Sequence, residues 1–372
     1  MPDVIPAPAA LTEAVDAALA GSRTRLEQLR ALGPYFRPGI RVALSTHINA
    51  DGDGCGSEVG LARALAAMGL RPVIVNPTPW PDNFRFLLDR AGDGPGDAAV
   101  EEASARGAAA LRDADLLVVL DIADVKRLGT LADAVRSLTI PKLTIDHHLP
   151  SDEPPSAVVV SDVSASATGE LIFDLLGALD RPLSPAIATA LYVAILTDTG
   201  GFRFSNTSPR CHAVAAELLA AGVDPEAMYR RIYASVPVGK LYLLREALGT
   251  LEVEAGHGLA WISIPAGAME RHGVKSEDLD GIVEQPRSIA GTRLALLFRD
   301  LGHGKVKVSF RSTGDVDVNA LARQFGGGGH AKASGAMIAG TMEAVRTRVL
   351  DAARAHVRAT AGEGTGPASL GT

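Results

Sequence analysis

Short strand-like apolar runs alternate with helical patterns through the first half of this 372-residue chain. The run Leu116–Leu120 is apolar at every position, which is typical of a strand buried on both faces of a parallel sheet. Strands are expected at residues 41–45, 72–75, 116–120, 142–145 and 157–160, and helices at about 11–32, 57–68, 167–176 and 185–196. Because strands that alternate with helices build parallel sheets, we expect a Rossmann-like α/β domain here.

The second half of the chain has a different pattern, which indicates a second domain. A chain of this length exceeds the usual domain size of roughly 100 to 200 residues. Strands at 259–264, 292–299 and 305–312, with helices at about 317–325 and 341–356, predict a smaller α/β domain. The expected organisation is a larger domain at 25–207, a helical linker at 208–238, the smaller domain at 239–356 and a disordered tail at 357–372.

The composition excludes several classes of protein. Hydrophobic residues make up 47% of the chain and charged residues 21%, as in ordinary soluble globular proteins. Two cysteines, Cys55 and Cys211, cannot build a disulfide framework. The sequence lacks a membrane-spanning apolar run and a signal-peptide pattern, so we expect a cytoplasmic protein. The net charge of −7 argues against a large basic surface for nucleic acid, although residues 239–356 carry a slight excess of Lys and Arg.

Acidic residues and histidines gather where the expected strands and helices of the larger domain end. The segments are THINADGDG with His47, Asp51 and Asp53, VVLDIAD with Asp121, LTIDHH with Asp146, His147 and His148, and AILTDTGG with Asp198. Because the carboxyl ends of parallel strands share one edge of a sheet, we expect these segments to converge. Taken alone, each Asp is better explained as a helix cap or a turn former.

This convergence predicts a metal centre. Carboxylates that lie together in a crevice repel one another unless cations neutralise them. A donor set of carboxylate oxygens and imidazole nitrogens without thiolates favours Mn²⁺, with Mg²⁺, Co²⁺ or Zn²⁺ as substitutes. Cys55 lies inside the first segment, and we interpret it as a small packing residue.

A glycine-rich segment marks the smaller domain as the part that contacts phosphates. The run Gly326–Gly329 lets backbone N–H groups approach an anion, and a helix start or a nest there would add positive potential. His330 can donate to a phosphate, and Arg311 can pair with a phosphate or stack on a base. The expected substrate-binding residues are Arg311, Ser312, Gly327, Gly328, Gly329 and His330. A flexible loop and a solvent-facing arginine remain the structural alternatives.

Together these segments resemble the motifs of the DHH phosphoesterases, a family named after the triplet Asp146-His147-His148. The segment GGGGHAKASG, preceded by SFRS at Ser309–Ser312, resembles the DHH-associated C-terminal domain. The resemblance covers about residues 25–355, and the motifs in this order are more specific than any one of them. Ala50 departs from the proline that often precedes Asp-Gly-Asp, and Gly54-Cys55 departs from the usual alanine and aliphatic residue.

The resemblance implies a role for each residue of the metal centre. His47 and Asp51 would hold one metal ion, whereas Asp53, His147 and Asp198 would hold another. Asp121 would bridge the two ions. As catalytic residues, His148 would face the substrate phosphate, and Asp146 would orient the neighbouring histidines.

The resemblance also implies an activity. The motifs are most similar to the branch of oligoribonucleases and 3′-phosphoadenosine 5′-phosphate phosphatases. We therefore expect a hydrolase with two divalent ions that cuts short single-stranded RNA or DNA and linear dinucleotides to 5′-mononucleotides, and that acts as a homodimer. The alternatives are a manganese inorganic pyrophosphatase, a RecJ-like exonuclease and a nucleotide sensor that does not hydrolyse its ligand.

Overall fold

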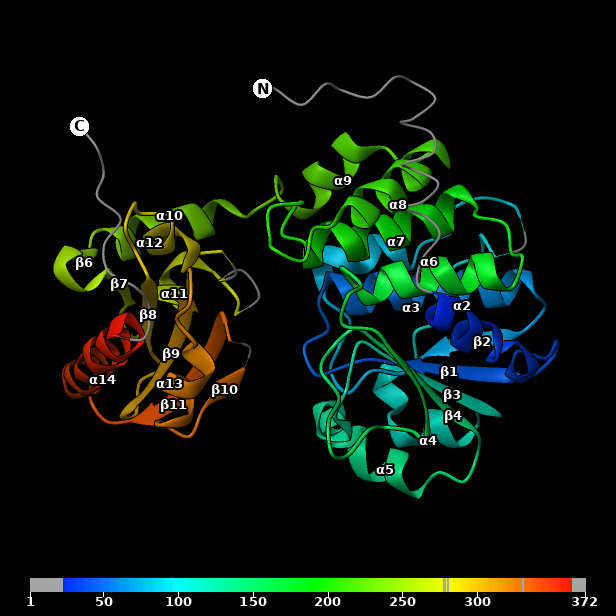
Figure 1. The fold of residues 1–372 in the computed structure, drawn as a ribbon, viewed down its shortest axis with the longest axis horizontal. Coiled ribbons are helices and arrows are strands. Elements are labelled where there is room, and N and C mark those ends of the chain that lie inside the picture. Colours follow the sequence, from blue (N-terminus) through cyan, green and yellow to red (C-terminus); the bar gives the residue numbers. More distant parts are fainter. Residues whose placement is uncertain (1–22, 95, 277–278, 280, 330, 363–372) are drawn as a thin grey trace. The chain divides into compact units, whose positions relative to one another are not determined.

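The computed structural model describes residues 23–94, 96–276, 279, 281–329 and 331–362. The chain divides into two compact units, Met1–Ala234 and Ser235–Thr372 (Figure 1). Among the described residues, no helix is long and apolar enough to cross a lipid bilayer. Part of the helix expected at 11–32 lies outside this range, and α2 (Arg23–Arg30) is the described part.

A five-stranded parallel sheet organises the N-terminal unit, as the sequence predicts. Its strands are β1 (Arg41–Ser45), β2 (Arg71–Ile74), β3 (Leu116–Leu120), β4 (Lys142–Asp146) and β5 (Val158–Ser161). Their order, β2-β1-β3-β4-β5, makes the chain reverse its winding direction between β1 and β3. At such a switch point the connections leave towards opposite faces of the sheet, and a crevice opens at the carboxyl ends of the strands.

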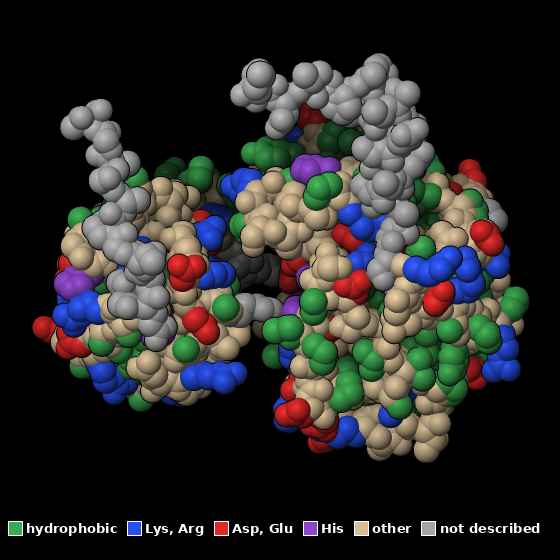
Figure 2. Space-filling view, viewed as in Figure 1, with side chains coloured by type: hydrophobic (Ala, Val, Ile, Leu, Met, Phe, Trp, Pro, Cys, Tyr) green, Lys and Arg blue, Asp and Glu red, His purple; other side chains and the backbone are tan. Residues whose placement is uncertain are grey.

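Helices cover both faces of this sheet (Figure 1). On one face lie α3 (Gly52–Ala67), α6 (Thr168–Ala178) and α7 (Pro185–Asp198), which share an apolar core with α2, α8 (Pro209–Ala220) and α9 (Pro225–Ile232). On the other face lie α4 (Ala108–Arg112), α5 (Ala132–Ser137) and the 3-10 segment Val125–Leu131. Shorter 3-10 turns occupy Gly33–Tyr35, Asp82–Leu87 and Ser104–Arg106. On the face shown in Figure 2, acidic and basic side chains are interspersed over this unit.

Glycines in α3 allow this helix to lie directly against α7. A Cβ atom added at Gly56 would lie 2.4 Å from the carbonyl oxygen of Ala190, and one added at Gly52 would lie 2.3 Å from the hydroxyl of Thr197. A larger residue at either position would push the helices apart. The close approach brings the start of α3, with Asp51 and Asp53, to the end of α7, which is Asp198.

Gly56→Ala is expected to lower the free energy of unfolding by about 1–3 kcal/mol, because overpacking forces the backbone to shift. A matched control is Gly177→Ala near the end of α6, where an added Cβ meets no heavy atom within 4 Å. That control is expected to raise the free energy of unfolding by about 0.4–1 kcal/mol, because it restricts the unfolded chain. Urea unfolding of both variants measures the two effects, and equal stabilities would contradict the close packing of α3 on α7.

A six-stranded mixed sheet with order β10-β11-β9-β8-β7-β6 organises the C-terminal unit. The strands are β6 (Glu252–Glu254), β7 (Leu259–Ile264), β8 (Leu294–Asp300), β9 (Lys305–Ser312), β10 (Gly328–Gly329) and β11 (Ala333–Ala339). The helices are α10 (Val238–Leu248), α11 (Ala268–His272), α12 (Glu284–Arg287), α13 (Val318–Arg323) and α14 (Met342–Gly362), with a 3-10 turn at Ala255–His257. One apolar core lies beneath α13 and α14, and a second lies beneath α10, α11 and α12.

This unit confirms the predicted α/β class, but three details differ from the sequence prediction. The sequence pattern reveals neither α10 nor β11, since β11 is rich in Ala and Gly and becomes a strand through its pairing with β9. The last helix continues to Gly362 instead of ending at His356, because Val357 is only 2% exposed and packs in the core. This corrects the predicted start of the tail at 357, and residues 363–372 lie outside the described range.

Candidate metal centre

Residues that follow three neighbouring strands meet at one edge of the N-terminal sheet. His47 comes shortly after β1, Asp121 directly follows β3, and Asp146 ends β4. His147 and His148 come next in the chain. Because β1, β3 and β4 are adjacent, their carboxyl ends bring these side chains together, as the sequence predicts.

One group of potential metal ligands consists of His47, Asp51 and Asp121. The Nε2 atom of His47 lies 3.4 Å from Asp121 Oδ2 and 3.7 Å from Asp51 Oδ1. Asp51 also caps α3, since its Oδ1 accepts hydrogen bonds from the backbone N–H groups of Asp53 and Gly54 at 3.1 and 3.2 Å. Capping fixes the carboxylate of Asp51 beside His47.

A second group consists of Asp53, His147 and Asp198. The Nε2 atom of His147 lies 3.6 Å from Asp53 Oδ2, 3.7 Å from Asp198 Oδ2 and 3.5 Å from Asp121 Oδ1. Asp121 therefore presents Oδ2 to His47 and Oδ1 to His147. A carboxylate in this position can bridge two cations, and the ligand roles that the family resemblance implies remain a prediction.

The donors in both groups fit divalent cations. Asp53 and Asp121 are each 2% exposed, and within the described residues no Lys or Arg side chain pairs with them. The Nε2 atom of His47 is also buried, and it has no hydrogen-bond partner in the described part of the chain. Buried charges and buried polar atoms without partners are costly, and cations between these groups would satisfy them.

Backbone contacts orient both imidazole rings towards the carboxylates. The Nδ1 atom of His47 lies 2.9 Å from the carbonyl oxygen of Ile48, and Nδ1 of His147 lies 3.3 Å from that of Ala165. Donation from Nδ1–H to a carbonyl leaves the lone pair on Nε2, which faces the acidic residues. Both rings are therefore oriented as metal ligands.

His148 makes a different contact. Its Nδ1 atom lies 2.8 Å from Oδ1 of Asp146 and 3.6 Å from Oδ1 of Asp121. Asp146 is 1% exposed, so its carboxylate is held in the core behind the ring. His148 also belongs to a third group of potential ligands with Asp121 and His147, and its role towards a substrate remains a prediction.

The backbone of Asp121 is strained. Its φ angle is 63°, in the left-handed region that residues with a Cβ atom rarely occupy. Such a conformation costs about 1–3 kcal/mol and persists where the surrounding structure fixes it. Here the N–H group of Asp121 donates to the carbonyl of Ile145 on β4 at 3.1 Å. The strain places the carboxylate between the two histidines.

Thr168 and Gly169, at the start of α6, support the site although the sequence prediction does not include them. The N–H groups of Thr168 and Gly169 donate to the two oxygens of Asp53 at 2.7 and 2.9 Å, and the Ser57 hydroxyl adds a bond at 3.0 Å. The Thr168 hydroxyl donates to Asp121 Oδ1 at 3.1 Å. Thr168 thus links carboxylates of both groups. In the sequence, the only sign of this role is a Thr-Gly pair at the start of a helix. Helix capping explains the same pair equally well.

Asn206 supports the remaining ligand. Its Nδ2 atom donates to Asp198 Oδ2 at 3.2 Å and to the carbonyl of Ser166 at 2.9 Å. This side chain joins the end of α7 to the segment before α6. The sequence offers no signal for it beyond a polar residue after the Thr-Gly-Gly turn.

A buried ion network holds that segment in place. Arg25 of α2 donates to Glu170 at 2.8 Å and to Asp174 at 3.0 Å, and Arg210 donates to Glu170 at 3.1 Å. Glu170 also accepts from the N–H and hydroxyl of Ser166 at 3.0 and 2.8 Å. The network fixes the start of α6, which in turn fixes Asp53.

The pKa values of the cluster show how strongly its charges interact. Burial raises the pKa of Asp53 well above its usual range, and the nearby Asp121 raises it further. Burial lowers the pKa of His47, but Asp121 and Asp51 outweigh burial and raise it to about 10. The same balance, with Asp121 and Asp53 opposing burial, raises the pKa of His147 to about 10. Protons on the imidazoles of His47 and His147 thus offset the carboxylate charge that metal ions would otherwise offset.

Metal binding is expected to release protons and to strengthen as the pH rises. Both imidazoles have an ordinary pKa of 6.5, which the fold raises to about 10. Their charged forms therefore stabilise the metal-free fold below pH 6.5, and this contribution is lost as the pH rises towards 10. A cation that binds within this range must displace the protons. Calorimetric titration with Mn²⁺ in buffers of different ionisation enthalpy measures the release, and identical heats in all buffers would contradict it.

Thr168→Val is expected to weaken Mn²⁺ binding by about tenfold to a hundredfold, because the variant loses the hydroxyl that holds Asp121. Thr168→Ser keeps the hydroxyl and is the matched control, with an affinity close to that of the unaltered chain. The concentration of free Mn²⁺, followed by electron paramagnetic resonance during a titration, gives both affinities without any substrate. Equal affinities of the Val and Ser variants would show that the hydroxyl does not contribute.

The glycine-rich segment of the C-terminal unit is more ordered than a flexible loop. It lies at the C-terminal end of α13 and leads into β10, which corrects the expectation of a helix start. A Cβ atom added at Gly327 would lie 2.2 Å from the carbonyl oxygen of Gly335, and one at Gly329 would lie 2.5 Å from that of Ala333. These glycines allow close packing against β11, and both Gly328 and Gly329 are exposed. Phosphate contact by the segment remains a prediction.

The other expected substrate residues have different surroundings. Arg311 is partly exposed, and its Nε atom lies 3.4 Å from Glu284. Ser312 is 2% exposed, and its hydroxyl donates to the carbonyl of Val316 at 2.7 Å. Ser312 therefore closes the turn after β9, and its contact with a substrate remains a prediction. His330 lies outside the described residues.

Comparisons with known proteins agree with this fold. Residues 41–195 match the N-terminal domain of the DHH family, and residues 262–361 match the DHHA1 domain. The chain is 34% identical over 332 residues to the bifunctional oligoribonuclease and PAP phosphatase NrnA of Thermus thermophilus, covering 88% of this chain and 92% of that protein. It is 29% identical to the protein of the same name from Bacillus subtilis, over 82% of this chain and 91% of that protein.

Solved structures show the same architecture. An exopolyphosphatase-related protein from Bacteroides fragilis superposes with a TM-score of 0.80 at 27% identity, covering 90% of this chain and 97% of that one. RecJ from Thermus thermophilus in complex with Mn²⁺ shares the fold with a TM-score of 0.51 at 17% identity, over 92% of this chain and 55% of that one.

The fold, the clustered histidines and acidic residues, and these likenesses define a phosphoester hydrolase. The chain belongs to the DHH family of phosphoesterases, with a DHHA1 domain in its C-terminal unit.

Proposed function

We propose that this chain is a manganese-dependent phosphodiesterase that hydrolyses short oligonucleotides and linear dinucleotides to 5′-mononucleotides, and that it also removes the 3′-phosphate of 3′-phosphoadenosine 5′-phosphate. The observation that carries the proposal is the position of Asp121, whose two oxygens face His47 and His147. The oligoribonuclease and PAP phosphatase names of the relatives at 34% and 29% identity support the substrate class.

In this proposal His47 and Asp51 hold one cation, and Asp53, His147 and Asp198 hold the other, with Asp121 shared between them. When bound, the two ions polarise the phosphoryl group and lower the pKa of the attacking water. Mixed oxygen and imidazole donors favour Mn²⁺, and Mg²⁺ or Co²⁺ can substitute. Thr168 and the N–H group of Gly169 hold the carboxylates of Asp121 and Asp53 in place.

His148 and Asp146 act as a pair on the substrate. The carboxylate of Asp146 accepts from Nδ1–H of His148, which fixes the ring and turns Nε2 towards the substrate phosphate. A protonated Nε2 donates a hydrogen bond to a phosphate oxygen, and this bond strengthens as negative charge builds up on phosphorus during attack. Asp146 is a positioning residue because it acts through His148.

The C-terminal unit supplies contacts that do not depend on base sequence. Arg311 can pair with a phosphate or stack on a base, and exposed backbone at Gly328 can approach an anion. His330 is assigned to the same contact as a prediction. Such a small set of contacts favours short substrates over long polymers, in agreement with the net charge of −7.

Hydrolysis assays with Mn²⁺ test the proposal on single-stranded RNAs from dinucleotide to pentanucleotide, on 3′-phosphoadenosine 5′-phosphate and on pyrophosphate. We expect mononucleotides from the RNAs and adenosine monophosphate from the second substrate.

Asp121→Asn is expected to lower kcat by about a thousandfold, because metal ions contribute several kcal/mol to transition-state stabilisation. The control is Asp124→Asn, which removes a carboxylate charge outside the metal centre and keeps an oxygen that can accept from the backbone N–H of Lys126.

Each alternative gives a different result. Hydrolysis of pyrophosphate alone would indicate an inorganic pyrophosphatase, and hydrolysis of long single strands in preference to short ones would indicate a RecJ-like exonuclease. Tight nucleotide binding without turnover would indicate a sensor. The homodimer and the cytoplasmic location remain predictions, and light scattering of the purified chain tests the first.

A further inference from the structure

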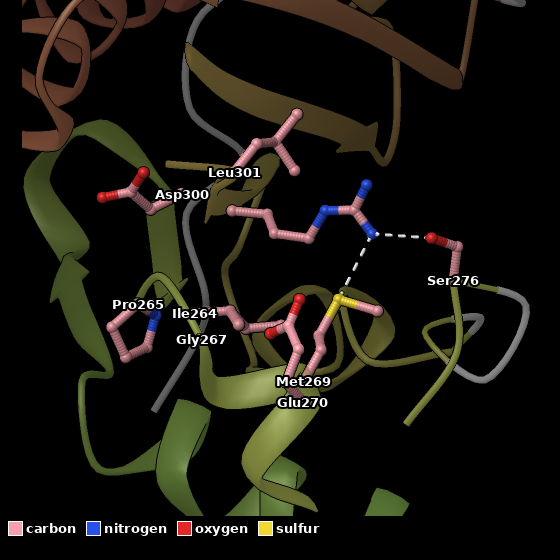
Figure 3. Close-up of a pocket in the computed structure, with 9 residues that line it drawn as sticks. Ile264, Pro265, Gly267, Met269, Glu270, Ser276, Asp300 and Leu301 are labelled. Carbon is pink, nitrogen blue, oxygen red and sulfur yellow. Dashed lines mark hydrogen bonds between the residues drawn. The ribbon is translucent and has the colours of Figure 1, made fainter. Parts of the chain in front are cut away.

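Buried polar atoms without a hydrogen-bond partner lower the stability of a fold, so each of them needs a physical reason. In the C-terminal unit, Nε of Arg299 is such an atom among the described residues. The Nη1 atom of Arg299 donates to the hydroxyl of Ser276 and to the sulfur of Met269, beside a cavity of about 180 Å³ (Figure 3). Glu270 and Asp300 also line this cavity, so its wall carries both signs of charge and favours no single class of ligand.

In the N-terminal unit, buried polar atoms of this kind include Nε2 of His47, Oγ1 of Thr46 and Oε1 of Glu58. Glu58 lies in the second turn of α3, and its side chain is completely buried. Burial raises the pKa of the Glu58 carboxyl to about 8. A carboxyl group with this pKa is mainly neutral at pH 7 in the metal-free fold, so it can lie in the core without a cationic partner.

The side chain of Asn76 connects Glu58 to the segment that carries His47. Asn76 follows β2, the strand beside β1, and is 2% exposed. Its Oδ1 atom accepts from the backbone N–H of Thr46 at 3.1 Å, and its Nδ2 atom donates to Oε2 of Glu58 at 2.8 Å. A primary amide suits this position because it accepts on one side and donates on the other. A chain of hydrogen bonds therefore runs from α3 through Asn76 to the residue after β1.

Thr46 also packs directly on the first turn of α3. A Cβ atom added at Gly54 would lie 2.8 Å from Oγ1 of Thr46, so a larger residue at this position would force Thr46 to shift. Asp51 is the N-terminal cap of the same helix. The hydrogen-bond chain and this close packing together fix the loop of His47 relative to Asp51, which belongs to the same ligand group.

The two ligand groups therefore have separate supports. The chain of hydrogen bonds through Asn76 fixes the loop of His47 relative to the start of α3. In the other group, the start of α6 holds Asp53, and Asn206 holds Asp198. Loss of the Asn76 side chain removes a support of the first group and leaves the hydrogen bonds of the second group in place.

We infer that Asn76 and Glu58 are positioning residues for the cation bound by the group that contains His47. The inference rests on the proposed function, which assigns one cation to each ligand group. Asn76 acts on the cation through Thr46 and the loop of His47, and Glu58 acts through Asn76. Residues that orient metal ligands in this way change metal affinity by about tenfold to a hundredfold without touching the metal.

Mn²⁺ binding to full chains with one disabled ligand group tests the inference without a substrate. Asp198→Ala leaves the group of His47, and His47→Ala leaves the group of Asp198. In the Asp198→Ala chain, the addition of Asn76→Leu is expected to weaken Mn²⁺ binding by about tenfold. In the His47→Ala chain, the same addition is expected to leave the affinity unchanged, because Asn76 acts through the lost ligand. Free Mn²⁺, followed by electron paramagnetic resonance, gives each affinity. An equal loss in both chains, or no loss in either, would overturn the inference.

Two substitutions of Glu58 in the Asp198→Ala chain separate positioning from a general loss of stability. Glu58→Gln keeps an oxygen that can accept from Asn76 and is expected to retain the Mn²⁺ affinity, whereas Glu58→Leu is expected to lose about as much as Asn76→Leu. The control is Ser156→Ala, which loses hydrogen bonds with Thr144 and Val158 away from His47. It is expected to lower the unfolding temperature and to leave the Mn²⁺ affinity unchanged.

An equal loss of affinity in Glu58→Gln and Glu58→Leu, or a loss in Ser156→Ala, would contradict the role of the hydrogen-bond chain. Thermal unfolding verifies that each variant is folded. If the unaltered chain binds Mn²⁺ and hydrolyses none of the proposed substrates, the proposed function fails, and the binding comparison still decides the inference. If the unaltered chain binds no Mn²⁺, the inference fails together with the proposed function.

Discussion

The mutual repulsion of buried carboxylates is the main physical constraint on the N-terminal unit. Asp53 and Asp121 are almost completely buried within one cluster, and His47 and His147 lie between their carboxylates and those of Asp51 and Asp198. Such an arrangement is unstable unless protons or cations offset the charge. The raised pKa values of both histidines indicate that protons offset the charge in the metal-free fold. A pair of divalent cations would offset it in place of these protons.

The fold holds this unfavourable cluster together through interactions outside it. Glycines of α3 allow close packing on α7, so ligands from both helices reach the same crevice. The start of α6 donates backbone and hydroxyl hydrogen bonds to Asp53 and Asp121, and buried arginines fix that segment from behind. The hydrogen bonds from α6 satisfy carboxylate oxygens of Asp53 and Asp121 in the buried cluster. The stability of the N-terminal unit is thereby coupled to the geometry of the site.

The sequence predicts the ligands because each one follows a strand or ends a helix of clear periodicity. Asp121 and His147 are identified by the apolar strands that precede them, and a parallel sheet then places them together. Thr168 and Asn206 are not identified, since their roles depend on which distant carboxylates reach them. The turn that the Ser312 hydroxyl closes is not predicted either, since the acceptor is the carbonyl of Val316 in the loop after β9. Strand β11 is missed because pairing with β9, and not its own composition, makes it a strand.

In the proposed metal centre, Asp121 would be shared between two metal ions. Electron paramagnetic resonance of the chain loaded with Mn²⁺ tests this sharing most directly, because two ions about 3.5–4 Å apart are magnetically coupled. Two Mn²⁺ ions per chain with a coupled spectrum are the expected result. A single ion per chain, or two ions with uncoupled spectra, would contradict this sharing.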